Sequence, residues 1–198
     1  QKRMSYVLGC IVCYLLGAVP FSVLFSRGML HKDVRRYGSG NPGTSNMTRA
    51  FGIKYGLLVL LFDMAKGFGA VYLGQWIMGP LGAYLGALCA VAGHNWPIYL
   101  KFKGGKGVAT TVGVMLAFVP YITLIAMACF LVVLAVSRYF SLGSLVCLGL
   151  VWVLVLCLHF ADTYLVVLCS VLVLVAFVQH RANIRRLKNG TENRFGSK

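Results

Sequence analysis

A glycine-rich stretch with two lysines, Lys103-Gly104-Gly105-Lys106-Gly107, stands directly before an apolar run that begins at Val108. Glycines let the main chain approach a ligand closely, and the first amides of a following helix favour an anion. Lys106 adds a full positive charge. The stretch therefore predicts a phosphate-binding loop, with a basic turn at a membrane surface as the alternative. It is not a Walker A loop, because Leu100 replaces the first glycine and Gly107 replaces the residue that binds Mg²⁺.

A second polar segment, Ser39-Gly40-Asn41-Pro42-Gly43-Thr44-Ser45-Asn46, consists of residues that favour turns and helix N-caps. Arg49 follows on the short helix that this segment is expected to begin. Main-chain N–H groups beside a guanidinium suit an oxyanion, since arginine binds phosphate through a planar fork of donors. An ordinary polar connector is the alternative. The density of small polar residues next to a positioned arginine favours anion recognition.

A third basic segment follows the last apolar run and contains His180, Asn183, Arg185 and Arg186. His180 and Asn183 are three residues apart and therefore share one helical face. They are suited to hydrogen-bond a polyol phosphate, whereas a snorkelling basic cap at a membrane exit is the alternative. His94, just upstream of the glycine-rich stretch, is a further candidate polar anchor.

The charge of the chain points to anionic partners. Its net charge is +15, with 19 Lys and Arg against 4 Asp and Glu. Phosphates or anionic lipid head groups fit this balance, while nucleic acid does not, because the basic residues are not interleaved with aromatics on one surface. The four acids are too dispersed to hold a hard cation, so we expect no metal and no cofactor. Asp63 and Lys66, three apart in an apolar run, predict an internal ion pair rather than a proton relay.

The elements that position these residues are membrane helices. Hydrophobic residues make up 59% of the 198 residues, and only 12% are charged. A span needs about 20 apolar residues. The runs that qualify, or nearly do, are Tyr6 to Phe25, Tyr55 to Leu73, Pro80 to Trp96, Val108 to Val136, Tyr139 to Leu158 and Thr163 to Gln179. The fourth run has 29 residues with Pro120 near its middle, so it is expected to break into two.

Seven crossings then place every basic loop on one side of the membrane. The linkers near Gly74 to Gly79, Pro120 and His159 to Asp162 carry no Lys or Arg. By the positive-inside bias, we predict an all-α, polytopic membrane protein with its N-terminus outside and its C-terminus cytoplasmic. Residues 1–198 are expected to form a single membrane-embedded domain. Gly82, Gly86 and Ala90 share one helix face and predict close helix packing.

Taken together, the three polar segments resemble the motifs of the bacterial PlsY family, the acyl-phosphate:glycerol-3-phosphate acyltransferases. The first resembling pattern is Ser39-Gly40-Asn41-x-Gly43-x-x-Asn46-x-x-Arg49. The second is Gly93-His94-x-x-Pro97, leading to Phe102-Lys103-Gly104-Gly105-Lys106-Gly107-x-Ala109-Thr110. The third is His180-x-x-Asn183-Ile184-x-Arg186-Leu187-x-x-Gly190-x-Glu192. The match follows the whole chain, with all three patterns in order.

The resemblance implies seven spans and transfer of a fatty acyl group from acyl phosphate to the 1-hydroxyl of glycerol 3-phosphate. Lysophosphatidate is the implied product, and the implied location is the bacterial cytoplasmic (inner) membrane with the site on the cytoplasmic side. We expect Ser39, Asn41, Lys106 and His180 to take part in the chemistry. The residues expected to bind substrate are Gly40, Gly43, Asn46, Arg49, His94, Lys103, Gly104, Gly105, Gly107, Thr110, Asn183 and Arg186. No protein partner is implied.

Within this hypothesis, Lys106 and the amides of residues 104–107 hold the head of the acyl phosphate, and Ser39 and Asn41 lie near its reacting carbonyl or phosphate. Arg49, together with the third segment, orients glycerol 3-phosphate. The base is a donor phosphate oxygen or His180; we prefer the phosphate, because neighbouring cations disfavour protonated His180. A transporter of a phosphorylated metabolite is the alternative function. A head-group phosphotransferase is a third, but it usually needs paired acids and a divalent metal.

Overall fold

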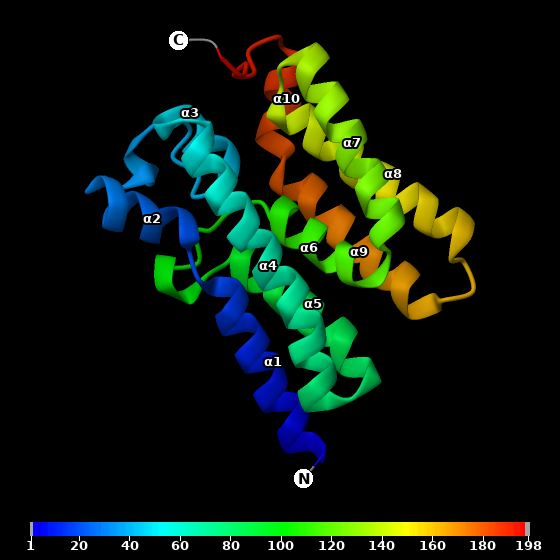
Figure 1. Ribbon diagram of the computed structural model, residues 1–198. Coiled ribbons are helices and arrows are strands. Elements are labelled where there is room, and N and C mark those ends of the chain that lie inside the picture. Colours follow the sequence, from blue (N-terminus) through cyan, green and yellow to red (C-terminus); the bar gives the residue numbers. More distant parts are fainter. Residues whose placement is uncertain (1, 197–198) are drawn as a thin grey trace. The chain divides into compact units, whose positions relative to one another are not determined.

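The computed structural model describes residues 2–196, and every regular element in that range is a helix (Figure 1). The helices form two compact units, Gln1–Ala117 and Phe118–Lys198. The prediction of an all-helical chain is therefore confirmed.

The first unit contains α1 to α5 and all of α6 except its last residue, Phe118. The bounds are α1 Lys2–Ala18, α2 Phe21–Leu30, α3 Thr44–Phe51, α4 Ile53–Met78, α5 Pro80–Asn95 and α6 Val108–Phe118, with two 3-10 turns, Val34–Arg36 and Ile98–Leu100. Helix α5 packs against both α1 and α4, and α3 packs against α4.

Small residues allow α5 to approach its neighbours at backbone distance. A Cβ on Gly86 would overlap the main-chain oxygen of Ala70 in α4, and a Cβ on Gly82 would overlap that of Gly74. On the other side, a Cβ on Gly17 of α1 would overlap the main-chain oxygen of Ala90. The predicted close packing through Gly82, Gly86 and Ala90 is confirmed, and it holds both partner helices of α5 in place.

The first apolar run, Tyr6 to Phe25, is interrupted by a break that its length alone did not predict. Helix α1 ends at Ala18, α2 begins at Phe21, and the two helices are bent by 41°. Pro20 explains the break, because it has no N–H to donate and it disfavours helical backbone at Val19. The break leaves the main-chain oxygen of Val19 available to a side chain.

The second unit contains α7 Pro120–Ser137, α8 Phe140–Leu158, α9 Thr163–Gln179 and α10 Arg181–Lys188. Helix α8 packs against both α7 and α9. The predicted break at Pro120 is confirmed, since α6 ends at Phe118 and Pro120 occupies the first turn of α7. Proline is favoured there because the first N–H groups of a helix have no partner within it.

In the part of the chain that the structure describes, three helices are long and apolar enough by themselves to cross a membrane: Ile53–Met78, Pro120–Ser137 and Phe140–Leu158. The count becomes five if the bent pairs α1 with α2 and α9 with α10 are each one span. Helices α5 and α6 have only 16 and 11 residues, short of the roughly 20 residues that a span requires. The number of seven crossings and the side of each terminus stay predictions.

Candidate active site

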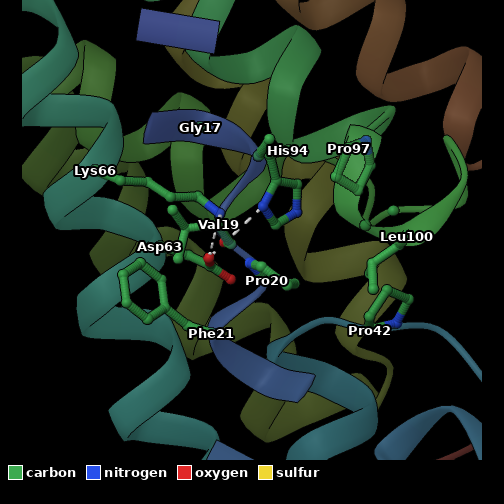
Figure 2. A pocket seen from close by; sticks show the side chains of 13 residues that line it. Gly17, Val19, Pro20, Phe21, Pro42, Asp63, Lys66, His94, Pro97 and Leu100 are labelled. Atoms are coloured by element: carbon green, nitrogen blue, oxygen red, sulfur yellow. Dashed lines mark hydrogen bonds and ion pairs between the residues drawn. The ribbon is translucent and has the colours of Figure 1, made fainter. Parts of the chain in front are cut away.

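A small pocket in the first unit brings two of the three predicted segments together. Its wall includes Pro42 from segment 39–46, Gly104 and Gly105 from the glycine loop, and Asp63, Lys66 and His94 from helices α4 and α5 (Figure 2). Its cavity volume is about 10 Å³, which is close to the volume that one water molecule needs. The two loops therefore meet at a polar site next to the α1–α2 break.

The glycine loop, residues 103–107, is folded onto the C-terminal end of α5. The N–H of Gly104 donates to the oxygen of Asn95 (3.1 Å), and the N–H of Gly105 donates to the oxygen of His94 (3.1 Å). A Cβ on Gly105 would overlap Nε2 of His94. The N–H groups of Gly104 and Gly105 are two of the main-chain N–H groups that we expected to bind the donor phosphate, and both instead donate to main-chain oxygens of α5. The features of this loop that still favour an anion are the charge of Lys106 and the N-terminal end of α6.

Beneath this loop lies a set of buried polar groups. The side chain of Asn95 is 2% exposed, and within residues 2–196 neither of its amide atoms has a hydrogen-bond partner. A Cβ on Gly107 would lie 2.7 Å from the Asn95 Oδ1 atom. The hydroxyl of Thr110, in the first turn of α6, is also buried without a hydrogen-bond partner in that range. Sequence reasoning selected Thr110 and missed Asn95, although a polar residue at the end of an apolar run was the available signal.

Segment 39–46 is organised from inside by Asn46. This side chain is 1% exposed. Its Nδ2 donates to the main-chain oxygens of Val34 (3.1 Å) and Tyr37 (3.0 Å), and its Oδ1 accepts the N–H of Ser39 (2.9 Å). Asn46, predicted as a substrate ligand, is placed to fix the turn that carries Ser39.

The other predicted residues of this segment are more accessible. Ser39 is exposed, and its hydroxyl oxygen lies 3.5 Å from the N–H of Asn41. Gly43 is the N-cap of α3, and half-buried Arg49 lies in the last turn of that helix. The segment thus combines a buried anchor with hydrogen-bonding groups at the surface. Gly40 adopts a φ of 71°, a left-handed conformation that glycine tolerates.

The third predicted segment belongs to the second unit. His180 lies at the junction of α9 and α10, which are bent by 58°, and its side chain is buried with Nδ1 2.7 Å from the oxygen of Ala176. Asn183 Nδ2 donates to Glu192 Oε1 (2.7 Å), and Arg186 Nε donates to Glu192 Oε2 (2.7 Å). The hydroxyl of Ser141 donates to the same carboxylate (2.9 Å). Glu192 therefore orients two residues that the sequence analysis expected to bind substrate.

The Glu192 carboxylate is kept ionised by these donors. Burial disfavours the charged form, but the hydrogen bonds from Asn183, Arg186 and Ser141 outweigh it and hold the pKa of Glu192 below its usual range. Sequence reasoning did not assign Glu192 a role. The signal was present, because it is one of only 4 acidic residues in the chain.

A buried charged cluster forms the floor of the pocket. Lys66 Nζ lies 2.7 Å from Asp63 Oδ1, with side chains that are 2% and 3% exposed, so the predicted ion pair is confirmed. Lys66 Nζ also donates to the main-chain oxygen of Val19 (3.0 Å). His94 Nδ1 lies 3.6 Å from Asp63 Oδ1 (Figure 2). The cluster connects α4, α5 and the α1–α2 break.

Comparisons with known proteins agree along nearly the whole chain. The family model described as glycerol-3-phosphate acyltransferase matches residues 7–190. Relatives named glycerol-3-phosphate acyltransferase include one from Thermoanaerobacter sp. (strain X514), 40% identical over 195 residues and covering 98% of each chain. Another, from Clostridioides difficile (strain 630), is 40% identical over 204 residues, covering 100% of this chain and 99% of the relative.

Two similar crystal structures are of PlsY (YgiH), described as an integral membrane glycerol 3-phosphate acyltransferase. The glycerol 3-phosphate form has a TM-score of 0.88, and the lysophosphatidic acid form has a TM-score of 0.86. Both are 34% identical in sequence, and the similarity covers 97% of this chain and 96% of theirs.

Proposed function

Because the chain belongs to the glycerol-3-phosphate acyltransferase family, we propose that it acylates the 1-hydroxyl of glycerol 3-phosphate with a fatty acyl group from acyl phosphate. The observation that carries this function is the full-length similarity to an acyltransferase solved in glycerol 3-phosphate and lysophosphatidic acid forms. The products are lysophosphatidate and inorganic phosphate. This is the first acylation in making a phospholipid.

In the reaction, the 1-hydroxyl oxygen attacks the carbonyl carbon of the acyl phosphate. The new ester C–O bond forms, the C–O bond to the phosphate breaks, and the hydroxyl proton leaves on the released phosphate. Both substrates carry negative charge, so the main demand on the protein is to hold two repelling phosphates in line. The excess of Lys and Arg over Asp and Glu meets that demand.

We assign the donor phosphate to Lys106 and the start of α6, with Ser39 and Asn41 beside the reacting carbonyl. Arg49, His180, Asn183 and Arg186 orient glycerol 3-phosphate. The further residues of the proposed site are Gly40, Gly43, Asn46, His94, Lys103, Gly104, Gly105, Gly107 and Thr110. Pro42 and Gly105 line one pocket, which supports a shared site for the first two segments. We further propose that residues 1–198 work as one acyltransferase domain.

The proposed base is an oxygen of the donor phosphate itself. No Asp or Glu lies in segment 39–46 or in the glycine loop. The Asp63 carboxylate in the pocket wall is paired with Lys66, and the Glu192 carboxylate already accepts three hydrogen bonds. His180 is the protein group that competes for this role. If His180→Gln removed a limb of the pH–rate profile while both substrates still bound, the base would be His180.

The proposed topology has seven spans, an external N-terminus and the active site on the cytoplasmic face of the bacterial inner membrane. The distribution of Lys and Arg supports it, because the linker between α6 and α7 and the linker between α8 and α9 contain neither. A reporter enzyme fused after Lys198 should be active only if the tail is cytoplasmic. An inactive reporter on a fusion protein that is present in the membrane would refute the orientation.

The test of function is a product assay on the purified full-length protein. Glycerol 3-phosphate is offered with either palmitoyl phosphate or palmitoyl-CoA, without added metal, and lysophosphatidate is measured. We expect product from the acyl phosphate and not from the thioester. Uptake of labelled glycerol 3-phosphate into protein-containing liposomes without a donor would instead support the alternative of a transporter.

A further inference from the structure

The Asp63–Lys66 ion pair poses an energetic question. Both side chains are almost completely buried, and their charged atoms are 2.7 Å apart. A buried ion pair repays its desolvation cost poorly, and replacing it with apolar residues of similar volume is often neutral or stabilising. Stability alone is therefore a weak explanation for this pair. The groups that the two side chains contact suggest a different role.

Lys66 contacts the α1–α2 break. Its Nζ donates to the main-chain oxygen of Val19 at 3.0 Å and lies 5.6 Å from the ring centroid of Phe21. Pro20 has no N–H and disrupts the local hydrogen-bond ladder. The ammonium group thus links α4 to an irregular stretch of backbone that also lines the pocket.

Asp63 is connected to the glycine loop by contacts through His94. The His94 ring lies between the two: its Nδ1 is 3.6 Å from Asp63 Oδ1, while its Nε2 is so close to Gly105 that a Cβ there would overlap it. The main-chain oxygen of His94 also accepts the N–H of Gly105. Both the ring and the backbone of His94 therefore contact the loop, and the carboxylate of Asp63 faces the ring from the other side.

We propose that Asp63 and Lys66 are positioning residues for the acyl transfer. Through their contacts with His94 and with the main-chain oxygen of Val19, they hold the glycine loop in place against α5 and the α1–α2 break. This proposal rests on the proposed function of the loop as a phosphate site. The cluster acts through His94 and does not touch the reacting atoms. The contact geometry favours this role over a water-filled proton path, because the pocket has room for about one water molecule.

The main test removes both charges together with Asp63→Asn and Lys66→Met. Removing one charge alone would leave the other buried and unpaired, which is strongly destabilising. The matched control is Thr123→Val in α7, which also removes a buried polar group that hydrogen-bonds to a main-chain oxygen, Val119, outside the proposed site. Lys106→Met serves as the reference for loss of the loop's own charge.

Lys106→Met should raise the KM of one of the two substrates. We expect the double variant to raise the KM of that same substrate by about tenfold or more. The KM of the other substrate should change less than about twofold, and Tm should stay within about 3 °C of the wild type. Hydrogen–deuterium exchange should speed up in residues 103–107 and stay unchanged in α8 and α9. Wild-type KM values together with wild-type loop exchange would overturn the proposal.

If the double variant does not fold, His94→Leu provides the second test, because it leaves the ion pair intact and removes the ring that lies between Asp63 and the loop, while the main-chain hydrogen bond from Gly105 to His94 can remain. Faster exchange in residues 103–107 is expected, and unchanged exchange there would overturn the proposal. The exchange measurement does not depend on catalysis. A wild-type protein that forms no lysophosphatidate would refute the proposed function, while the loop exchange would still decide the role of the cluster.

Discussion

Replacing Gly105 with alanine tests whether the glycine loop must lie against His94. A Cβ at this position would overlap His94 Nε2 and lie 2.9 Å from Cε1 and 3.0 Å from Cδ2 of the ring. Unbonded carbons prefer about 3.5–4.0 Å, so the ring or the loop must move by about 1 Å. The ring cannot retreat easily, since Asp63 lies on its other side and the residue is 8% exposed.

The loop is therefore expected to move, carrying Lys106 away from the donor phosphate. A displacement of about 1 Å can cost about 100-fold in rate, which corresponds to about 2.7 kcal/mol of transition-state stabilisation. Overpacking also costs about 1–3 kcal/mol of folding stability. We expect kcat/KM for acyl phosphate to fall about 100-fold, with a folded protein and a moderately lower Tm.

The matched control is Gly69→Ala in α4, because within residues 2–196 no atom beyond the chain neighbours and the local helix backbone lies within 4 Å of the added Cβ. Alanine at a helical glycine should stabilise the protein by about 0.5–1 kcal/mol and leave kinetics unchanged. Initial rates of lysophosphatidate formation, with each substrate varied in turn, compare the two variants. Wild-type kcat/KM in Gly105→Ala would refute the view that this contact sets the position of the loop.

Three further predictions concern the two loops and the second unit. Lys106→Met and Arg49→Ala should each lower kcat/KM by at least about 100-fold with an unchanged circular dichroism spectrum; substantial turnover by both would refute the site assignment. Asn46→Ala should leave the main-chain groups around Ser39 unpaired and cost about 1–3 kcal/mol, measured as a lower denaturation midpoint; an unchanged midpoint would contradict its role as the anchor of segment 39–46. The pKa of Glu192 is lower in the folded protein than its usual value of 4.5, so its stabilising effect is present above pH 4.5 and is lost as the pH falls below it. Thermal unfolding between pH 3 and pH 7 should therefore depend less on pH in Glu192→Gln than in the wild type, and equal slopes would contradict this.

The apolar helices were predictable because their signals are local. The α9 bounds, Thr163–Gln179, coincide with the predicted run, and α8 differs by one residue at its start. Pro120 marked the end of α6 because proline removes a hydrogen-bond donor wherever it stands. The break at Pro20 carried the same signal, but the run stays apolar on both sides, and its length alone fitted a single span.

The site was only partly predictable, because several roles depend on tertiary contacts. The sequence placed Gly105 and His94 near one another in the chain, yet only the fold shows that two loop amides are used by α5. Asn46 was expected at the ligand, but its contacts come from residues up to 12 positions away. Glu192 reaches Ser141 across 51 residues, a distance at which neither spacing nor periodicity carries information.

The placement of Asp63 and Lys66 on the same helix also bears on how the chain enters the membrane. A lone charge at the centre of a span costs about 2.5–3.5 kcal/mol during insertion. The two groups are three residues apart in α4, so they can neutralise each other as soon as this helix coils, before α1 or α5 has reached it. A pair divided between two helices would leave each charge exposed to lipid until assembly. Helix α4 can thus pass from the translocon into the lipid bilayer with almost no net charge, and its contacts with Val19 and His94 can form afterwards.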